Sequence, residues 1–459
     1  AITLIGRREC QRQGRIPVTR GNLAAVDIGI EFTIDFITDE QPPPASVEDE
    51  RSPMEDVFPP EVPEWRILPR VRKGLETAAP FWRDTQLRLQ PRVYYFDRQR
   101  DNAPDSEALA YGGRLAYNSG WWRDRLRLNA SLYTTQRAYG PDDKDGTLLL
   151  APGQEGITVL GEANLELQLR EDISAKLFRQ SFNLPYLNRN DSRMIPNTFE
   201  AYTLIKHPNE WAFVLSQVRK MKRRESDEFV SMSEAAGFDG TNDELTMGGF
   251  RYDFTKDINI GAITQYAWEY MNTFYSEANG VWRLDDDWAL RLGAQYTDQR
   301  SVGDEIGGEF DTYVYGGKVA ASYRNATLTL AFSSTDEGDR IRNPFGGYPG
   351  YLSLMIKNFS RADEDAWLVG ASYDFSRLGA PGLSSFINYA EGNTPDSGVN
   401  ASPDQRELDI TVDYRFQSAA LRGLWLRTRA AFVDQDDKVE GATDVDDIRV
   451  ILNYDLPIL

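Results

Sequence analysis

The feature that most constrains this chain is a strict alternation of apolar and polar side chains near its C-terminus. In residues 424–432, Leu, Leu, Thr, Ala and Phe occupy the even positions, and the odd positions include Arg427 and Arg429. Residues 447–456 repeat the pattern, with Arg449 among the polar positions. Successive side chains of a β-strand point to opposite faces. Each segment therefore predicts a strand with one apolar face and one charged face.

Two folds can use such strands. A soluble sandwich buries the apolar face in a core, whereas a membrane barrel turns it to lipid and directs the arginines into a lumen. The formal net charge of -20 and the lack of any run of about 20 apolar residues exclude a helical membrane protein. A barrel needs apolar residues only at alternate positions, and its rims favour aromatic side chains, which make up 12% of this chain.

The alternation recurs along the chain from Thr85 onward and predicts eighteen strands, an even number as in closed bacterial barrels. The predicted strands are 85–98, 107–118, 124–135, 156–169, 174–180, 200–206, 211–221, 245–254, 258–269, 273–284, 288–298, 311–324, 326–334, 365–375, 383–391, 405–416, 423–433 and 446–456.

The gaps between these strands fall into two classes. Tight turns are predicted at 120–124, 171–173, 207–210, 255–257, 285–287 and 325, and long loops at 139–154, 180–199, 222–244, 300–310 and 334–364. Short turns on one rim and long loops on the other are typical of an all-β, up-and-down transmembrane barrel. We assign residues 79–459 to this barrel.

Residues 1–78 differ from the barrel. Residues 26–36 alternate and predict one lone strand, and the proline-rich acidic segment 41–63 predicts an extended linker without fixed structure. We interpret residues 1–78 as a largely disordered N-terminal extension. A periplasmic plug or docking arm is the alternative.

The composition argues against several kinds of function. One cysteine and one histidine exclude a disulfide framework and any Cys/His metal site, and they leave no convincing catalytic triad. We therefore expect no enzyme activity, no cofactor and no metal. The acidic segments 142–146 and 444–447 lack the spacing of a dedicated calcium loop. The acidic balance also argues against nucleic acid as a partner.

The position of each side chain along its strand indicates which ones face the lumen. Arg125 and Arg127 alternate with Leu126 and Leu128 and are assigned inward, as are Arg427, Arg429 and Arg449. Asp409 and Asp413 face the lumen by the same argument.

Several segments resemble the OprD family of substrate-specific outer-membrane porins. They are Phe81-Trp-Arg-Asp-Thr with Arg92-Val-Tyr-Tyr-Phe-Asp-Arg98, the segment 180–202, Asn343-Pro-Phe-Gly-Gly-Tyr-Pro-Gly350 with the run to Trp367, Pro381-Gly-Leu-Ser-Ser-Phe-Ile-Asn-Tyr389, and the C-terminal run 448–459. The resemblance covers about residues 80–459 and implies an eighteen-stranded barrel in the bacterial outer membrane, in contact with the lipid bilayer and lipopolysaccharide.

The resemblance also implies a function and a site. Such porins take up small carboxylates, such as aromatic acids or amino acids, along a lumenal row of basic residues, and the third loop narrows the pore. The row here would be Arg92, Arg98, Arg427, Arg429 and Arg449, to which strand position adds Arg125 and Arg127. The constriction would carry Arg193, Asn190, Asp191 and Tyr186. Asp413 stands where family members with a lysine in that strand would have it, so a substrate that also carries a positive group stays open.

Two alternatives remain. The inward arginines can instead brace the wall by pairing with lumenal carboxylates such as Glu162, Glu166, Asp409 and Asp447. The whole barrel can also be a structural or export barrel whose lumen is plugged or adapted to a polysaccharide. Whether the chain is a monomer or a trimer is left open.

Overall fold

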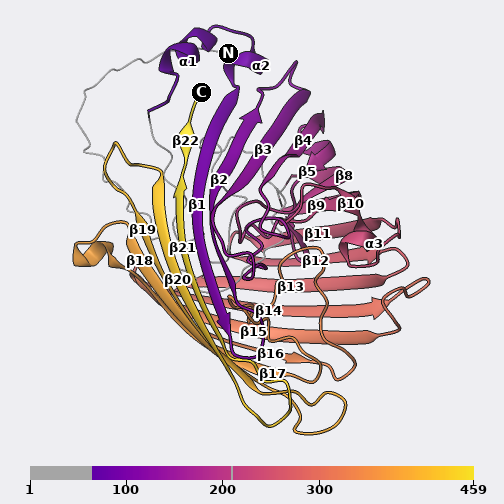
Figure 1. Cartoon of the computed structure of the whole chain (residues 1–459). Helices are drawn as coiled ribbons and strands as arrows, with labels where there is room; N and C mark the ends of the chain where they lie inside the picture. The colour runs from indigo at the N-terminus through magenta and orange to yellow at the C-terminus, as the bar shows by residue number, and fades with distance from the viewer. Residues whose placement is uncertain (1–64, 208–209) are drawn as a thin grey trace, which may run out of the picture.

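The computed structural model describes residues 65–207 and 210–459, and its main feature is one closed antiparallel barrel (Figure 1). The barrel strands are β1 (Gln86–Arg100), β2 (Ser106–Asn118), β3 (Leu126–Tyr139), β4 (Ile157–Arg170), β5 (Ile173–Gln180), β8 (Thr198–Lys206), β9 (Trp211–Lys222), β11 (Leu245–Thr255), β12 (Ile258–Ala267), β13 (Met271–Arg283), β14 (Trp288–Ser301), β15 (Asp311–Tyr323), β16 (Ala326–Thr335), β17 (Asp365–Asp374), β18 (Leu383–Asn393), β19 (Gln405–Arg415), β20 (Leu424–Gln435) and β21 (Val445–Tyr454).

Shorter elements complete the fold. They are the helices α1 (Pro69–Leu75), α2 (Pro80–Arg83) and α3 (Met232–Ala235), the 3-10 helix η2 (Phe375–Leu378), and the two-residue strands β6 (Asn183–Leu184), β7 (Leu187–Asn188), β10 (Val230–Ser231) and β22 (Leu456–Pro457).

The barrel closes because β1 pairs with β2 on one side and with β21 on the other. All eighteen predicted strands are confirmed, and each predicted end lies within four residues of the observed one. The predicted division of the connections is also confirmed. The tight turns lie at the end of the barrel that carries α1, α2 and the C-terminus, and the long loops lie at the other end (Figure 1).

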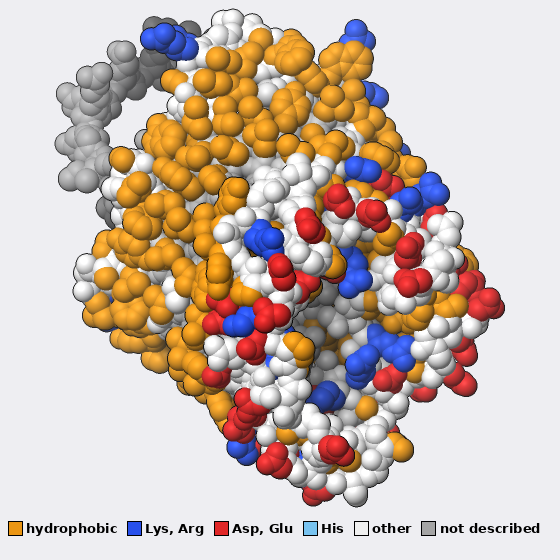
Figure 2. All heavy atoms as spheres, viewed as in Figure 1, with side chains coloured by type: hydrophobic (Ala, Val, Ile, Leu, Met, Phe, Trp, Pro, Cys, Tyr) orange, Lys and Arg blue, Asp and Glu red, His pale blue; other side chains and the backbone are white. Residues whose placement is uncertain are grey.

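The outer surface of the barrel is apolar. On β15 and β16 the side chains of Tyr315, Val319, Leu328 and Leu330 are exposed, whereas the alternate residues such as Thr329 are buried. Figure 2 shows the resulting hydrophobic belt beside a polar, hollowed face. Apolar residues outside and polar residues inside are the arrangement of a barrel in lipid, so a soluble sandwich is excluded. Within the part of the chain that the structure describes, no helix is both long and apolar enough to cross a membrane.

A test of the lipid-facing register is Leu330→Arg. Leu330 is 51% exposed in the middle of β16, and an arginine at the bilayer midplane costs roughly 2–4 kcal/mol. We expect a clear loss of the folded fraction when the variant is refolded into lipid vesicles, measured by heat-modifiable migration on gels. Leu330→Ala, which adds no charge, is the matched control and should fold like the parent protein.

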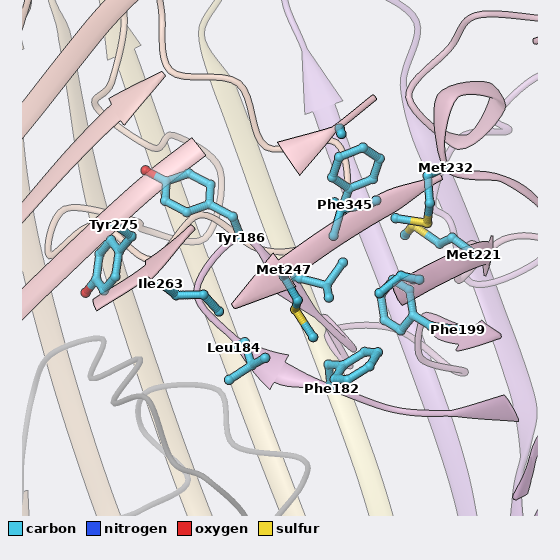
Figure 3. Close-up of a cluster of buried hydrophobic side chains, with 14 of the residues drawn as sticks. Phe182, Leu184, Tyr186, Phe199, Met221, Met232, Met247, Ile263, Tyr275 and Phe345 are labelled. Carbon is cyan, nitrogen blue, oxygen red and sulfur yellow. The ribbon is translucent and has the colours of Figure 1, made fainter. Parts of the chain in front are cut away.

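The interior of the barrel is asymmetric. Residues 181–197, the connection between β5 and β8, fold inward and pack a hydrophobic cluster against β9, β11, β12 and β13 (Figure 3). Phe182, Leu184 and Leu187 come from this loop and pack with Met221 and Met247 from the wall. Apolar packing fills this side of the lumen, whereas buried arginines and carboxylates gather on β19, β20 and β21.

The first described residues dock at the turn end of the barrel. The backbone N–H of Ile67 donates to Pro457 O at 3.0 Å, and that of Leu68 donates to Ile458 O at 3.0 Å. The segment just before α1 is thereby joined to the C-terminal end of the chain. The predicted lone strand 26–36 and linker 41–63 lie outside the described residues.

Candidate functional site: the lumenal constriction

The register of three neighbouring strands brings the lumenal arginines together. Arg427 on β20 lies opposite Asp413 on β19, and Arg429 lies opposite Arg449 on β21. Arg449 in turn lies opposite Phe96 on β1. Like charges that face each other across a sheet destabilise it, so the Arg429–Arg449 pair has no evident role in stabilising the fold.

Five of the predicted arginines form ion pairs, four of them within the wall and one, that of Arg92, with loop 181–197. The N···O distances are 2.8 Å for Arg92–Asp191, 2.7 Å for Arg98–Asp447, 2.7 Å for Arg127–Glu166, 2.7 Å for Arg427–Asp413 and 2.6 Å for Arg449–Asp447. For these five the structure shows the bracing contacts that the sequence left open as an alternative. Removing one partner of such a buried pair would leave an uncompensated charge.

Arg193, Arg224 and Arg429 differ from those five, because none of them forms an ion pair with any carboxylate of the described residues. Their side chains donate hydrogen bonds to neutral oxygens. Arg193 donates to Thr147 O at 2.8 Å, Arg224 to Ser192 Oγ at 2.6 Å, and Arg429 to Thr411 Oγ1 at 3.1 Å.

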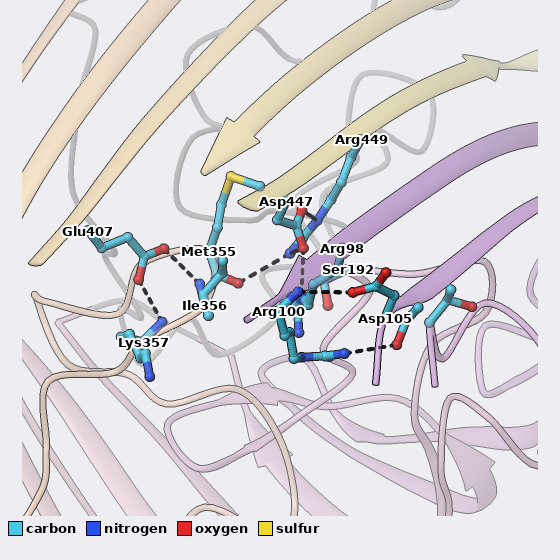
Figure 4. Close-up of polar contacts among 12 residues, drawn as sticks. Arg98, Arg100, Asp105, Ser192, Met355, Ile356, Lys357, Glu407, Asp447 and Arg449 are labelled. Atoms are coloured by element: carbon cyan, nitrogen blue, oxygen red, sulfur yellow. Dashed lines mark hydrogen bonds and ion pairs between the residues drawn. The ribbon is translucent and has the colours of Figure 1, made fainter. Parts of the chain in front are cut away.

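The aromatic ring of Phe96 joins loop and wall. The guanidinium carbons of Arg193, Arg449 and Arg98 lie 4.9, 5.1 and 5.2 Å from its centroid, within the range of cation–π attraction. We define the guanidinium cluster as Arg98, Arg193, Arg224, Arg429 and Arg449. Asp447, which binds both Arg98 and Arg449, is the carboxylate ion-paired with it among the described residues (Figure 4).

The electrostatics of the loop arginines reflect this crowding. Burial and the neighbouring Arg449 and Arg224 hold the pKa of Arg193 well below its usual range. A pKa moves in this direction when the charged form is short of water and of counter-charge. An anion that enters the cluster would supply that counter-charge.

The predicted constriction residues of loop 181–197 fall into two groups, those in polar contacts and one that belongs to the hydrophobic cluster. The side chain of Asp191 is buried and ion-paired with Arg92 and Arg189, and Asn190 accepts a hydrogen bond from Ser192 Oγ at 2.9 Å. Tyr186 was wrongly predicted to line the constriction. It is 2% exposed and donates to Thr297 Oγ1 at 2.9 Å, because its ring belongs to the hydrophobic cluster that fixes the loop to the wall.

A second inward loop, residues 336–364 between β16 and β17, meets the first. The side chain of Asn188 accepts a hydrogen bond from Gly347 N at 2.8 Å and donates one to Gly347 O at 3.1 Å. A Cβ atom at Gly346 would lie 2.7 Å from Asn188 atoms, so the two chains approach too closely for a side chain there. The two loops therefore narrow the lumen as one unit.

The tip of loop 336–364 is held by lumenal carboxylates (Figure 4). Glu407 accepts hydrogen bonds from the backbone N–H groups of Ile356 at 2.8 Å and Lys357 at 2.7 Å, and Asp409 accepts one from Met355 N at 3.0 Å. Asp409 and Asp413 are buried at alternate positions of β19. Asp409 is committed to this loop, however, and Asp413 to Arg427.

One further assignment is corrected. Arg125 does not lie on the lumenal face of a strand, because β3 begins one residue later and Arg125 is exposed in the preceding turn. The sequence reasoning also missed two residues. Glu407 lies two residues before Asp409 on the same strand, so the alternation argument would have assigned it to the lumen as well. For Arg224 the only signal in the sequence is the basic run Lys220–Arg224.

These features define a class of protein. A closed barrel with a lipid-facing exterior and a polar lumen narrowed by inward loops is an outer-membrane channel of the porin type. The chain belongs to the OprD family: the protein-family sequence profile described as "outer membrane porin, OprD family" matches residues 79–458. It is located in the bacterial outer membrane and conducts small solutes.

Individual relatives agree with this assignment. The porin-like protein GalP of Pseudomonas putida is 25% identical over 292 residues, which cover 62% of this chain and 68% of GalP. The crystal structure of OccK9 (OpdG) of Pseudomonas aeruginosa has a TM-score of 0.75 at 25% identity and covers 83% of this chain and 100% of its own. The structure of OpdK of the same species with vanillate has a TM-score of 0.72 at 20% identity, covering 82% and 99%.

Proposed function

We propose that this porin is a passive, selective channel for small solutes that carry a carboxylate, and that the guanidinium cluster attracts and passes them. The observation that carries the proposal is that Arg193, Arg224 and Arg429 form no ion pair with the described carboxylates although they lie beside further guanidiniums. A guanidinium stays charged at working pH and offers a planar fork to a carboxylate.

Several cations close together favour flux over trapping. An anion can pass from one guanidinium to the next, so that no single deep well holds it. Of the predicted basic row, Arg429 fits this role best, while Arg92, Arg127 and Arg427 brace the walls through their ion pairs. The two inward loops favour a small solute over a polysaccharide.

The state of the lumenal acids narrows the substrate class. Asp409 and Asp413 are committed to Met355 N and Arg427, so they are poorly placed to bind an ammonium or guanidinium group of a substrate. Aromatic acids are therefore better candidates than basic amino acids. The relative OpdK, solved with the aromatic acid vanillate, is consistent with this choice.

The test compares benzoate with benzamide, its neutral analogue, and with arginine. In planar bilayers we expect an anion-selective reversal potential in a KCl gradient and a benzoate-dependent change of the ionic current. In liposome swelling we expect faster entry of benzoate than of benzamide or arginine. Cation selectivity, or equal entry of benzoate and benzamide, would contradict the proposal. A barrel that carries no ohmic current would favour the structural or export alternative.

A further inference from the structure

A second basic hollow lies among the long loops, apart from the guanidinium cluster. Its volume is about 720 Å³, and it lies between residues 236–238, Tyr270, Gly307 and loop 336–364. Small-molecule sites commonly enclose about 300–1,000 Å³, so the hollow has room for one small solute with water. Figure 2 shows Lys and Arg side chains gathered in the hollowed face, among acidic side chains.

The charge of this hollow is opposite to that of the protein. Arg340, Arg342, Lys357 and Arg361 line it, and no aspartate or glutamate does so among the described residues. The whole chain, in contrast, has 71 Asp and Glu against 51 Lys and Arg. A cationic hollow within an acidic protein concentrates anions locally.

The four cations divide into two kinds. Arg342 is fixed by Asp339 at 2.6 Å, with its guanidinium carbon 3.6 Å from the centroid of Phe310, and Arg361 is fixed by Glu364 at 2.7 Å. Arg340 and Lys357 form no ion pair with any carboxylate that the structure describes. Burial lowers the pKa of Lys357, and the opposing effect of Glu407 is smaller. An anion beside this ammonium would offset its lost hydration.

The rest of the lining is apolar or neutral. Phe238 packs edge-on against Tyr270, with centroids 4.8 Å apart, and Pro344 and Ile356 extend the apolar surface. Asn343 and Asn358 add amide groups. A site that combines cations, an aromatic wall and a few amides matches a ligand with an anionic group on an aromatic body.

The position of the hollow connects it to the pore. Ile356 and Lys357, at the tip of loop 336–364, line the hollow, and their backbone N–H groups donate hydrogen bonds to Glu407 on the lumenal wall. Gln405 also lines the hollow. It lies two residues before Glu407 on β19, so both side chains are on the same, lumenal face of the strand. A solute bound here would lie directly outside the constriction.

We propose that this hollow is a capture site for aromatic carboxylates on the loop side of the barrel, with Lys357 and Arg340 binding the carboxylate and Phe238 contacting the ring. The proposal deepens the proposed function and rests on it, since a captured solute is useful only if the pore then passes it.

The experiment uses the full-length protein in planar bilayers, with benzoate added from the loop side or from the turn side. For Lys357→Gln/Arg340→Gln we expect the half-maximal benzoate concentration from the loop side to rise about tenfold, with KCl conductance and the response from the turn side unchanged. Phe238→Ala should weaken benzoate more than acetate. Lys357→Arg/Arg340→Lys keeps the charges and serves as the matched control.

The outcomes separate capture from passage. An unchanged loop-side response in the double variant, or equal responses to benzoate and inorganic phosphate in the parent protein, would overturn the capture site while the proposed function stands. A parent protein that is anion-selective but shows the same response from both sides would also overturn it. Failure of the proposed function would appear differently, as loss of anion selectivity and of benzoate entry in the parent protein itself.

Discussion

Replacing Arg429 with glutamine is expected to lower the anion-over-cation permeability ratio of the pore by about tenfold. Arg429 lies opposite Arg449 and donates a hydrogen bond to Thr411 Oγ1. A unit charge about 6 Å from a passing ion contributes about 2–3 kcal/mol at an effective dielectric constant near 20, and salt screening reduces this to roughly the 1.4 kcal/mol of a tenfold change. The reversal potential in a KCl gradient measures the ratio.

The same substitution should leave the barrel intact. Arg429 forms no ion pair with the described carboxylates and interacts with buried Asp409 only beyond ion-pair distance. Glutamine therefore breaks no buried ion pair, and the thermal transition is expected to stay close to that of the parent protein. Arg427→Gln is the informative contrast, because it leaves the buried Asp413 carboxylate without its ion-pair partner and should destabilise the barrel. Arg429→Lys should retain most of the selectivity. An Arg429→Gln pore with unchanged selectivity would remove Arg429 from the solute path.

Replacing Glu407 with glutamine and Asp409 with asparagine is expected to free the tip of loop 336–364. The two carboxylates accept three backbone hydrogen bonds, at 2.7, 2.8 and 3.0 Å. The two oxygens of Glu407 each accept one of these bonds, and glutamine replaces one oxygen by an NH2 group that cannot accept, so one backbone N–H loses its partner and the loop tip loses about 1–3 kcal/mol of stabilisation. This loss should raise the population of the released loop about tenfold.

Single-channel recording should detect this release as frequent steps to a wider, higher-conductance level. Limited proteolysis should show faster cleavage within residues 353–358. Glu391→Gln is the control: Glu391 lies on the neighbouring strand β18 and accepts no backbone hydrogen bond from the loop. A double variant that is as quiet and as protease-resistant as the parent protein would show that other contacts, such as Asn188 with Gly347, hold the loop.

The sequence predicted the barrel well because the barrel depends on a local rule. Each strand must alternate apolar and polar residues, so Leu126 and Leu128 could be assigned to lipid and Arg427 to the lumen without knowledge of the partners. The ion pairs could not be assigned, because Arg92 pairs with Asp191 across 99 residues and Arg98 with Asp447 across 349.

The inward loops escaped prediction for another reason. Loop conformation follows no period, and a tyrosine that follows Pro185 in a polar loop is equally compatible with an exposed and a buried position. Tyr186 is buried because the loop folds against Tyr275 and Tyr348, with ring centroids 6.2 and 6.1 Å away. Only the three-dimensional arrangement shows this packing, and the same holds for the cations that line the hollow.

The way the loop tip is fastened has a consequence for how such a channel can diversify. Glu407 and Asp409 accept hydrogen bonds from backbone N–H groups and not from the side chains of Met355 and Ile356. Every residue except proline has such an N–H group. The bore can therefore be reshaped by exchanging those two side chains while the fastening itself is preserved. Substitutions at a few tip positions therefore change which solutes such a porin admits, while the barrel stays the same.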